Sequence, residues 1–225
     1  MVSLYLGLSV LTPLPAASEL AVAERYQDGA IDAKVINLYS RTQITLEADG
    51  KAYTGTRDVI AYLVENASRL VKRGTYLIDV IHEDKLDPNF ALLLSRNDEE
   101  LKAKCAGLVS EFLSGPFYDP KIAADSGLLA ITEAHYDTIA AFVNQDLLNY
   151  LPASGFIGGE EPGEDVFHLG AWMARIVLTL GVQTSEEAAQ AIEKSYGKPL
   201  PEKVAYWRAW VSKPSWKKVY AEGLH

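Results

Sequence analysis

The stretch from Gln43 to Val71 constrains the fold most, because it joins a hairpin directly to a helix. Its first part, "QITLEADGKAYTG", consists of two short strand-like runs that meet at Asp49-Gly50, a strong short-range signal of a β-hairpin. Its second part, "TRDVIAYLVENASRLV", predicts a helix that begins at Thr56. The apolar residues of this helix share one face: Val59, Ile60, Leu63 and Val64. The chain therefore presents a helix N-terminus at the end of a β-hairpin.

The residues before the hairpin predict a strand, a helix and a second strand. "SLYLGLSV" at 3–10 and "AKVINLY" at 33–39 have strand-like patterns, and "PAASELAVAERYQ" at 15–27 has a helical one. The resulting order β-α-β-β-β-α is a parallel unit, an antiparallel hairpin and a final helix, which is a thioredoxin-like arrangement. We expect a thioredoxin-like domain over residues 1–65 and a polar linker over residues 66–74.

Residues 75–225 contain helical patterns and loops, which predict an all-helical second domain. The fold class is therefore α/β plus all-α. Amphipathic patterns predict helices at 101–113, 137–151, 165–180 and 201–214, the last of them ending at Pro214. The helix at 165–180 is apolar on nearly all sides, and such a helix belongs at the centre of a bundle.

Composition narrows the range of functions. A net charge of -9 and a pI near 5.0 argue against a nucleic-acid partner and against an anionic membrane, since either needs a basic surface. No stretch reaches about 20 uninterrupted apolar residues, so we expect no membrane span. The apolar start has no Lys or Arg before Arg25, which favours a core strand over a signal peptide.

The single cysteine and the histidines do not predict a disulfide or a metal site. Cys105 alone excludes an intramolecular disulfide and fits a reducing compartment, so we expect a cytoplasmic protein. Its position on an apolar helical stripe favours a buried residue over a nucleophile. The histidines lack metal-ligand spacing: His82, His135, His168 and His225. We expect no metal, and we expect His168 to be a buried core residue.

Two parts of the chain resemble one protein superfamily. "LEADGKAYTGTRDVIAYL" resembles the glutathione-binding half of cytosolic glutathione transferases, and "GFIGGEEPGEDVFHLGAWMARI" with "YWRAWVSKPSWKKVY" resembles their helical half. The chain therefore resembles a divergent member of that superfamily, and we expect a fungal source. The resemblance implies glutathione as a co-substrate, an apolar small molecule as the second substrate, a role in detoxification, and a homodimer.

The resemblance also implies where the glutathione sulfur would bind. The family uses a Ser, Tyr or Cys in the loop after the first strand, often before a proline, and Thr12-Pro13 matches that position. A threonine hydroxyl that donates to the sulfur favours thiolate over thiol, whose ordinary pKa is about 8.5. Ser9 is the alternative donor. The other interpretation is that Thr12 only precedes a turn and caps the following helix.

Three further positions correspond to the glutathione contacts of the family. Ile44 replaces the cis-proline before the third strand, whose backbone binds the cysteinyl part of glutathione. Because a non-proline cis peptide costs roughly 2.5–4 kcal/mol, we expect this geometry to be lost. Gly55 and Thr56 stand where an acidic or amide residue and a serine bind the γ-glutamyl group. Thr56 keeps the hydroxyl and the helix N-terminus for a carboxylate, whereas Gly55 offers no side chain for the ammonium.

The link between the second and third strands is too short for the helix that the family has there. Only Ser40, Arg41 and Thr42 separate "AKVINLY" from "QITLE". In a sheet ordered 2-1-3-4 this link must cross about 9.6 Å. Its residues reach about 14 Å, so we expect the strand order to survive without the helix. Arg41 and Arg57 are nearby cations that could meet a carboxylate, although a surface arginine usually has no special role.

In the helical half, the family begins its core helix with a Ser/Thr-x-x-Asp capping box. Asp165 matches the acid and Pro162 replaces the hydroxyl residue, so we expect the Asp165 carboxylate to accept from N–H groups of its own first turn. Tyr118 and Trp172 are candidates to line an apolar pocket for the electrophile. Aromatic residues of helical bundles are more often core residues, and that interpretation stays open.

Two functions therefore remain in view. The first is an enzyme that conjugates or exchanges the glutathione thiolate with an apolar electrophile. The second is a non-catalytic protein of the same fold that binds a ligand or a partner and has lost conventional glutathione binding. The short link, Ile44 and Gly55 favour the second, whereas Thr12-Pro13 and Thr56 favour the first. We take the enzyme as the first hypothesis.

Overall fold

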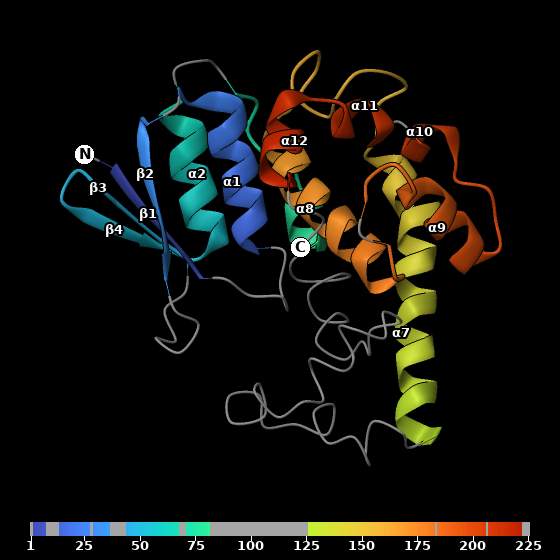
Figure 1. Cartoon of the computed structure of the whole chain (residues 1–225). Coiled ribbons are helices and arrows are strands. Elements are labelled where there is room, and N and C mark those ends of the chain that lie inside the picture. The colour runs from blue at the N-terminus through green and yellow to red at the C-terminus, as the bar shows by residue number, and fades with distance from the viewer. Residues whose placement is uncertain are drawn as a thin grey trace. The chain divides into compact units, whose positions relative to one another are not determined.

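The protein is described by a computed structural model over residues 2–7, 14–27, 29–36, 44–67, 71–81, 126–182, 184–205 and 207–221 (Figure 1). The first part of the chain forms β1 (Val2–Gly7), α1 (Leu14–Arg25), β2 (Ile31–Ile36), β3 (Thr45–Ala48), β4 (Lys51–Thr54), α2 (Thr56–Glu65) and α3 (Leu77–Asp79). The later part forms α7 (Ser126–Asn144), the 3-10 helix η4 (Asp146–Asn149), α8 (Glu164–Thr179), α9 (Ala188–Tyr196), α10 (Glu202–Ala205), α11 (Trp207–Val211) and α12 (Pro214–Val219). The predicted order β-α-β-β-β-α is confirmed.

The four strands form one sheet in the order β2-β1-β3-β4. β1 pairs with β2 in parallel, and β3 runs antiparallel to both β1 and β4. β3 and β4 are joined at Asp49 and Gly50, whose φ angles are 53° and 73°. Tight hairpin turns of this kind need positive φ at both central residues, which an Asp-Gly pair adopts readily. The predicted hairpin and the predicted strand order are both confirmed.

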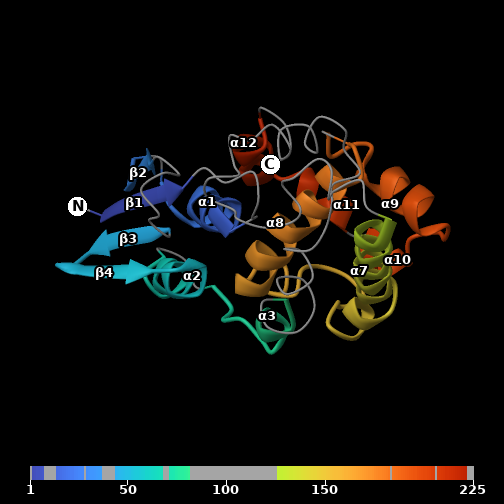
Figure 2. The ribbon, with the colours of Figure 1, turned by 90° about the horizontal axis from the view of Figure 1, so that it is seen from below.

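α1 and α2 lie side by side on one face of the sheet (Figure 2). The burial of β3 alternates accordingly, because Leu46 and Ala48 are buried while Glu47 between them is exposed. The predicted apolar face of α2 is buried as well: Val59, Ile60, Leu63 and Val64. The register places Asp32 and Thr54 on the face of Glu47, and both are exposed. Residues 37–43, which link β2 to β3, lie outside the described residues.

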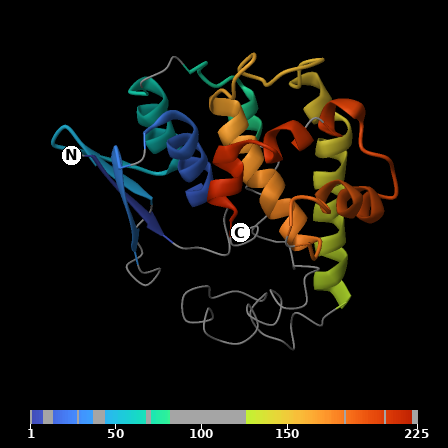
Figure 3. The same cartoon turned by 45° about the horizontal axis from the view of Figure 1, so that its top comes forward.

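One compact unit of the chain comprises Met1–Ile78, Pro152–Arg175 and Tyr206–His225. It therefore combines the sheet, the first three turns of α8 and the C-terminal helix α12, which packs beside α1 (Figure 3). An aromatic cluster contributes to its core, with ring centroids 5.1 Å apart for Trp210 and Trp216 and 4.4 Å apart for Trp216 and Tyr220. Gly170 of α8 is required there, because a Cβ at this position would overlap the Trp210 ring.

Pro214 begins a helix in this unit, and the prediction that it ends one is incomplete. The described part of 201–214 is helical in α10 and α11, and Pro214 is the first residue of α12. Proline suits that position, because the first helical N–H needs no partner within the helix and the ring already holds a helical φ. The prediction depends on the other property of proline, its interruption of a preceding helix.

The second compact unit comprises Asp79–Leu151 and Ile176–Ala205. The helix predicted over 137–151 is confirmed as far as Asn144, and Gln145 then separates α7 from η4. Lys203 of α10 donates to the carbonyls of Leu148 and Leu151 at 3.2 and 3.3 Å, which ties α10 to η4. The helix predicted over 165–180 corresponds to α8, whereas α9 was not predicted.

The predicted helix over 101–113 and Cys105 lie outside the described residues. The predicted domain boundaries at residues 65 and 75 stay a prediction.

Candidate functional site

The N-terminus of α2 is the described part of the predicted site. Gly55 precedes the helix with φ 92° and ψ 150°, a backbone region that is essentially restricted to glycine. Its N–H donates to the Ile44 carbonyl at 2.9 Å, and its own carbonyl accepts from Val59 N–H at 3.0 Å. Gly55, the N-cap residue, makes no side-chain cap. The first-turn N–H groups after Gly55 therefore have no acceptor within the helix, as at any helix start.

Thr56, the first helical residue, is 6% exposed. In the part of the chain that the structure describes, its hydroxyl has no hydrogen-bond partner. Buried hydroxyls without a partner are uncommon, and leaving one unsatisfied costs about 1–3 kcal/mol. A ligand oxygen or a water molecule would remove this cost. The hydroxyl and the first-turn N–H groups together form a donor set that suits a carboxylate.

The neighbouring predicted residues differ in their surroundings. Ile44 is 6% exposed, and its carbonyl is occupied by the Gly55 N–H. The described residues contain no cis peptide bond, but the bond before Ile44 involves residue 43, which lies outside them. The expected loss of the cis geometry thus stays a prediction. Arg57 is exposed on the first turn of α2, and Gly55 is half-buried.

The remaining predicted site residues are less informative. Thr12, Ser9, Arg41 and Tyr118 all lie outside the described residues, so their roles stay predictions. Trp172 of α8 is 1% exposed, which favours its interpretation as a core residue. His168 on the same helix is also 1% exposed, as expected for a core histidine.

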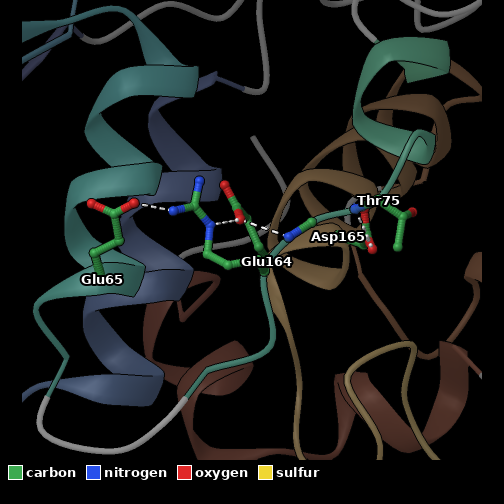
Figure 4. Close-up of polar contacts among 6 residues, drawn as sticks. Glu65, Thr75, Glu164 and Asp165 are labelled. Carbon is green, nitrogen blue, oxygen red and sulfur yellow. Dashed lines mark hydrogen bonds and ion pairs between the residues drawn. The ribbon is translucent and has the colours of Figure 1, made fainter.

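The N-terminus of α8 contains a polar network that the sequence analysis missed (Figure 4). Glu164 accepts from Arg73 Nε at 2.8 Å and from Gly74 N–H at 2.7 Å. Asp165 accepts from Thr75 N–H, with its two oxygens 2.9 and 3.1 Å away. The two carboxylates thereby fix residues 73–75 to the start of α8.

Further contacts continue this network on both sides. Arg73 also forms an ion pair with Glu65 at the end of α2. The hydrogen bond that Arg73 donates to Glu164 is the main reason why the pKa of Arg73 is raised. The N–H of Glu164 donates to the Lys72 carbonyl at 3.0 Å. Burial raises the pKa of Asp165 above its ordinary value, against the opposing effect of the Thr75 N–H. The segment predicted as a polar linker is therefore held by several bonds.

The prediction for Asp165 is wrong in its choice of donor. Its carboxylate binds the N–H of Thr75, 90 residues away in the chain, and not its own first turn. Pro162, in the place of the capping hydroxyl, contributes its carbonyl instead, which accepts from Arg25 of α1. An acid at a helix start can serve either purpose, and only the approach of residues 73–75 selects the partner.

A lysine before α12 joins three segments in the same unit. Lys213 donates to Glu24 of α1 and to Glu161, in both cases at 3.0 Å. Its ammonium also lies 5.0 Å from the ring centroid of Phe156. The hydrogen bond from Lys213 is the main reason why the pKa of Glu161 is lowered. These contacts hold the loop before α8 against α1.

Two other features are absent from the residues that the structure describes. The described residues hold no group of three or more His, Cys, Asp or Glu side chains that could bind a metal ion. Within the same residues, no helix is both long enough and apolar enough to cross a membrane.

Comparison with known proteins identifies the fold. No protein-family model and no curated protein sequence matches the chain. A glutathione S-transferase from Rhodospirillum rubrum superposes with a TM-score of 0.58 and 17% identity, over 98% of this chain and 92% of that one. A glutathione transferase from Populus trichocarpa gives 0.54 and 14%, over 100% of both chains. A glutathione transferase homolog from Burkholderia with bound glutathione gives 0.50 and 13%, over 98% of this chain and 96% of that one.

These structures come from bacteria and a plant, and the fungal source stays a prediction. The predicted fold class, a thioredoxin-like domain followed by a helical domain, is confirmed by the likeness over the whole chain. The predicted loss of the helix between the second and third strands falls on residues 37–43, outside the described residues, and stays a prediction. The chain has the fold of the glutathione transferases.

Proposed function

We propose that the protein is a glutathione transferase-like enzyme, which conjugates or exchanges the glutathione thiolate with an apolar electrophile. The observation that carries this proposal is the open start of α2. It has no side-chain cap, and the buried hydroxyl of Thr56 has no partner among the described residues. A carboxylate at this place would accept from the hydroxyl and from first-turn N–H groups, at the positive end of the helix dipole.

The fold supports the choice of glutathione as the carboxylate ligand. The Burkholderia homolog, which superposes over nearly the whole chain, contains bound glutathione. In the proposal, Thr12 or Ser9 donates to the glutathione sulfur and favours the thiolate. The thiolate then forms a C–S bond with the electrophile as the leaving group departs. Arg41 and Arg57 are the proposed cations for a ligand carboxylate.

The remaining parts of the proposal follow from the same resemblance. Tyr118 is proposed to contact the apolar electrophile, which is the small-molecule partner, whereas Trp172, at 1% exposed, is assigned to the core. We propose a homodimer in the cytoplasm with a role in detoxification, and no nucleic-acid or membrane partner, in line with the net charge of -9.

A second candidate is a non-catalytic protein of this fold that binds a different ligand. Two observations favour it. Gly55 has no side chain to hold an ammonium group, and the Ile44 carbonyl already accepts from Gly55 N–H at 2.9 Å. Glutathione needs backbone partners for its cysteinyl part. The Ile44 carbonyl already has a partner within the chain, so it is less suited to that role.

Calorimetric titration of the full chain with glutathione tests the binding step. We expect binding at millimolar or lower glutathione, and we expect Thr56→Val to weaken it about tenfold through the loss of one hydrogen bond to a charged group. Thr54→Val is the matched control, because Thr54 is an exposed threonine two residues earlier in β4, and it should leave the affinity unchanged. Absence of heat at millimolar glutathione would contradict the enzyme proposal.

Turnover of a model electrophile then separates the two candidates. In an enzyme, Thr12→Val should lower turnover while glutathione still binds, with Ser9→Ala as the parallel variant. If neither variant changes turnover, the assigned donors are wrong. Glutathione binding without any turnover would favour the non-catalytic candidate.

A further inference from the structure

A surface hollow at the C-terminal ends of α7 and α9 belongs to the second compact unit, whereas α2 belongs to the first. Its volume is about 190 Å³. Its lining residues come from the last turns of α7, from the residue after it, and from the end of α9: Asp137, Ala140, Ala141, Asn144, Gln145, Tyr196 and Lys198. This volume is below the range of about 300–1,000 Å³ that is typical of drug-sized ligands, so the hollow suits a small molecule.

Two opposite charges line this hollow without pairing. Within the described part of the chain, neither the Asp137 carboxylate nor the Lys198 ammonium forms a hydrogen bond or an ion pair within 4.0 Å. Asp137 and Lys198 are both exposed, so burial does not stop either side chain from forming an ion pair. A ligand that carries both a positive and a negative charge can bind between Asp137 and Lys198 and pair with each of them.

The C-terminal ends of α7 and α9 bring partial negative charge to the hollow. α7 ends at Asn144 and α9 ends at Tyr196, and the last carbonyls of a helix carry partial negative charge. Gly197 ends α9 in the left-handed conformation, with φ 63° and ψ 20°, and Lys198 follows it. Asn144 donates to the Ala140 carbonyl at 2.8 Å, which leaves its own side-chain oxygen as an acceptor. The end of α7 at Asn144 therefore favours a ligand ammonium, and the Asp137 carboxylate, about two turns earlier in the same helix, attracts it through its own charge.

We propose that this hollow binds a small zwitterion of the α-amino acid class. Its ammonium is bound by the Asp137 carboxylate and by the side-chain oxygen of Asn144, the last residue of α7. Its carboxylate is bound by Lys198 and by the amide of Gln145. Ala140 and Ala141 leave space for a short side chain. The proposal is independent of the one for α2, since neither charged residue belongs to the first compact unit.

Amide chemical shifts of the full-length protein, recorded during titration, test the proposal. The probes are L-alanine, which carries both charges, and propionate and ethylamine, which carry one each. We expect millimolar L-alanine to shift the amides of Asn144, Gln145 and Lys198, and we expect each single-charge probe to bind at least about tenfold more weakly. Equal binding of ethylamine or of propionate would overturn the zwitterion assignment.

Two variants and one matched control complete the test. Asp137→Asn and Lys198→Gln should each weaken L-alanine binding about tenfold, since each removes one charged partner. Lys194→Gln is the control, because Lys194 is an exposed lysine of α9 that does not line the hollow. Absence of shifts at the hollow would overturn the proposal, and so would an equal loss of affinity in the control. Shifts confined to Gly55 and Thr56 would also overturn it, because they would assign the amino acid to α2.

Discussion

Two helices of the same compact unit begin in opposite ways. α8 begins with Glu164 and Asp165, which are 3% and 2% exposed and whose carboxylates accept from Arg73, Gly74 and Thr75. α2 begins after Gly55 without a side-chain cap, and the hydroxyl of Thr56 has no partner among the described residues.

The difference separates a structural helix start from a candidate binding site. Buried polar groups are nearly always hydrogen-bonded, so each group of a buried helix start needs a partner from somewhere. At α8 the chain supplies partners for both carboxylates. At α2 the chain leaves donors open, and a ligand or water must complete them. The four predictions below test this contrast.

Truncation of Glu164 should have the largest effect. Glu164→Ala removes the acceptor of Gly74 N–H and of Arg73, so we expect a loss of about 2–4 kcal/mol in the free energy of unfolding, measured with urea. Glu65→Ala is the control, because Glu65 is 60% exposed and pairs with the same Arg73. It should cost at most about 1 kcal/mol. Equal losses of unfolding free energy in the two variants would contradict a special structural role for Glu164 at the start of α8.

Gly55→Ala should have the second largest effect. An alanine must adopt φ 92° there, which costs about 1–3 kcal/mol. The measurement is again urea unfolding, with Thr54→Ala as an exposed neighbour that should stay within about 0.5 kcal/mol of the original protein. A loss below about 0.5 kcal/mol for Gly55→Ala would mean that the start of α2 does not require glycine.

Thr56→Val should leave stability unchanged or raise it by up to about 1 kcal/mol, because it removes a buried hydroxyl that has no partner. Thr179→Val is the matched comparison. Thr179 is 1% exposed, and its hydroxyl donates to the Ile176 carbonyl at 2.7 Å. That variant should lose about 1 kcal/mol. If Thr56→Val destabilises the protein as much as Thr179→Val, the Thr56 hydroxyl has a partner within the chain.

Asp165→Asn should have the smallest effect, visible only in the pH dependence. Burial raises the pKa of Asp165 above 3.8, so the folded chain holds this proton at pH values where the unfolded chain has released it. The contribution of Asp165 to the free energy of unfolding is therefore full below pH 3.8 and decreases as the pH rises through the raised pKa. Asparagine should remove this decrease while keeping one acceptor for Thr75 N–H. Identical profiles of melting temperature against pH would contradict the prediction.

The sequence predicted the sheet better than the polar contacts. The Asp49-Gly50 turn, the strand order and the apolar face of α2 depend on local patterns with periods of two and 3.6 residues, and such patterns are readable in any short window. Of the candidate site, Thr56 and Gly55 could be placed at a helix start from the same local signal. The absence of a partner for Thr56 could not be predicted, because it depends on every group that surrounds the hydroxyl.

Pro214 and Asp165 show why the other expectations needed correction. Proline both ends and begins helices, and only the following residues, packed around Trp216, decide which property applies. Asp165 suits a cap for its own helix or for another segment.

The amino-acid sequence by itself thus determined the strands and helices of the thioredoxin-like part and their order, since each depends on neighbouring residues. Only the tertiary structure decided which polar groups are satisfied. Arg73 and Glu164 are 91 residues apart in the chain, and their hydrogen bond exists because folding brings the two segments together. The same folding encloses Thr56 without bringing its hydroxyl a partner among the described residues, because hydrogen bonds need a donor and an acceptor within about 3 Å and no sequence pattern sets that distance.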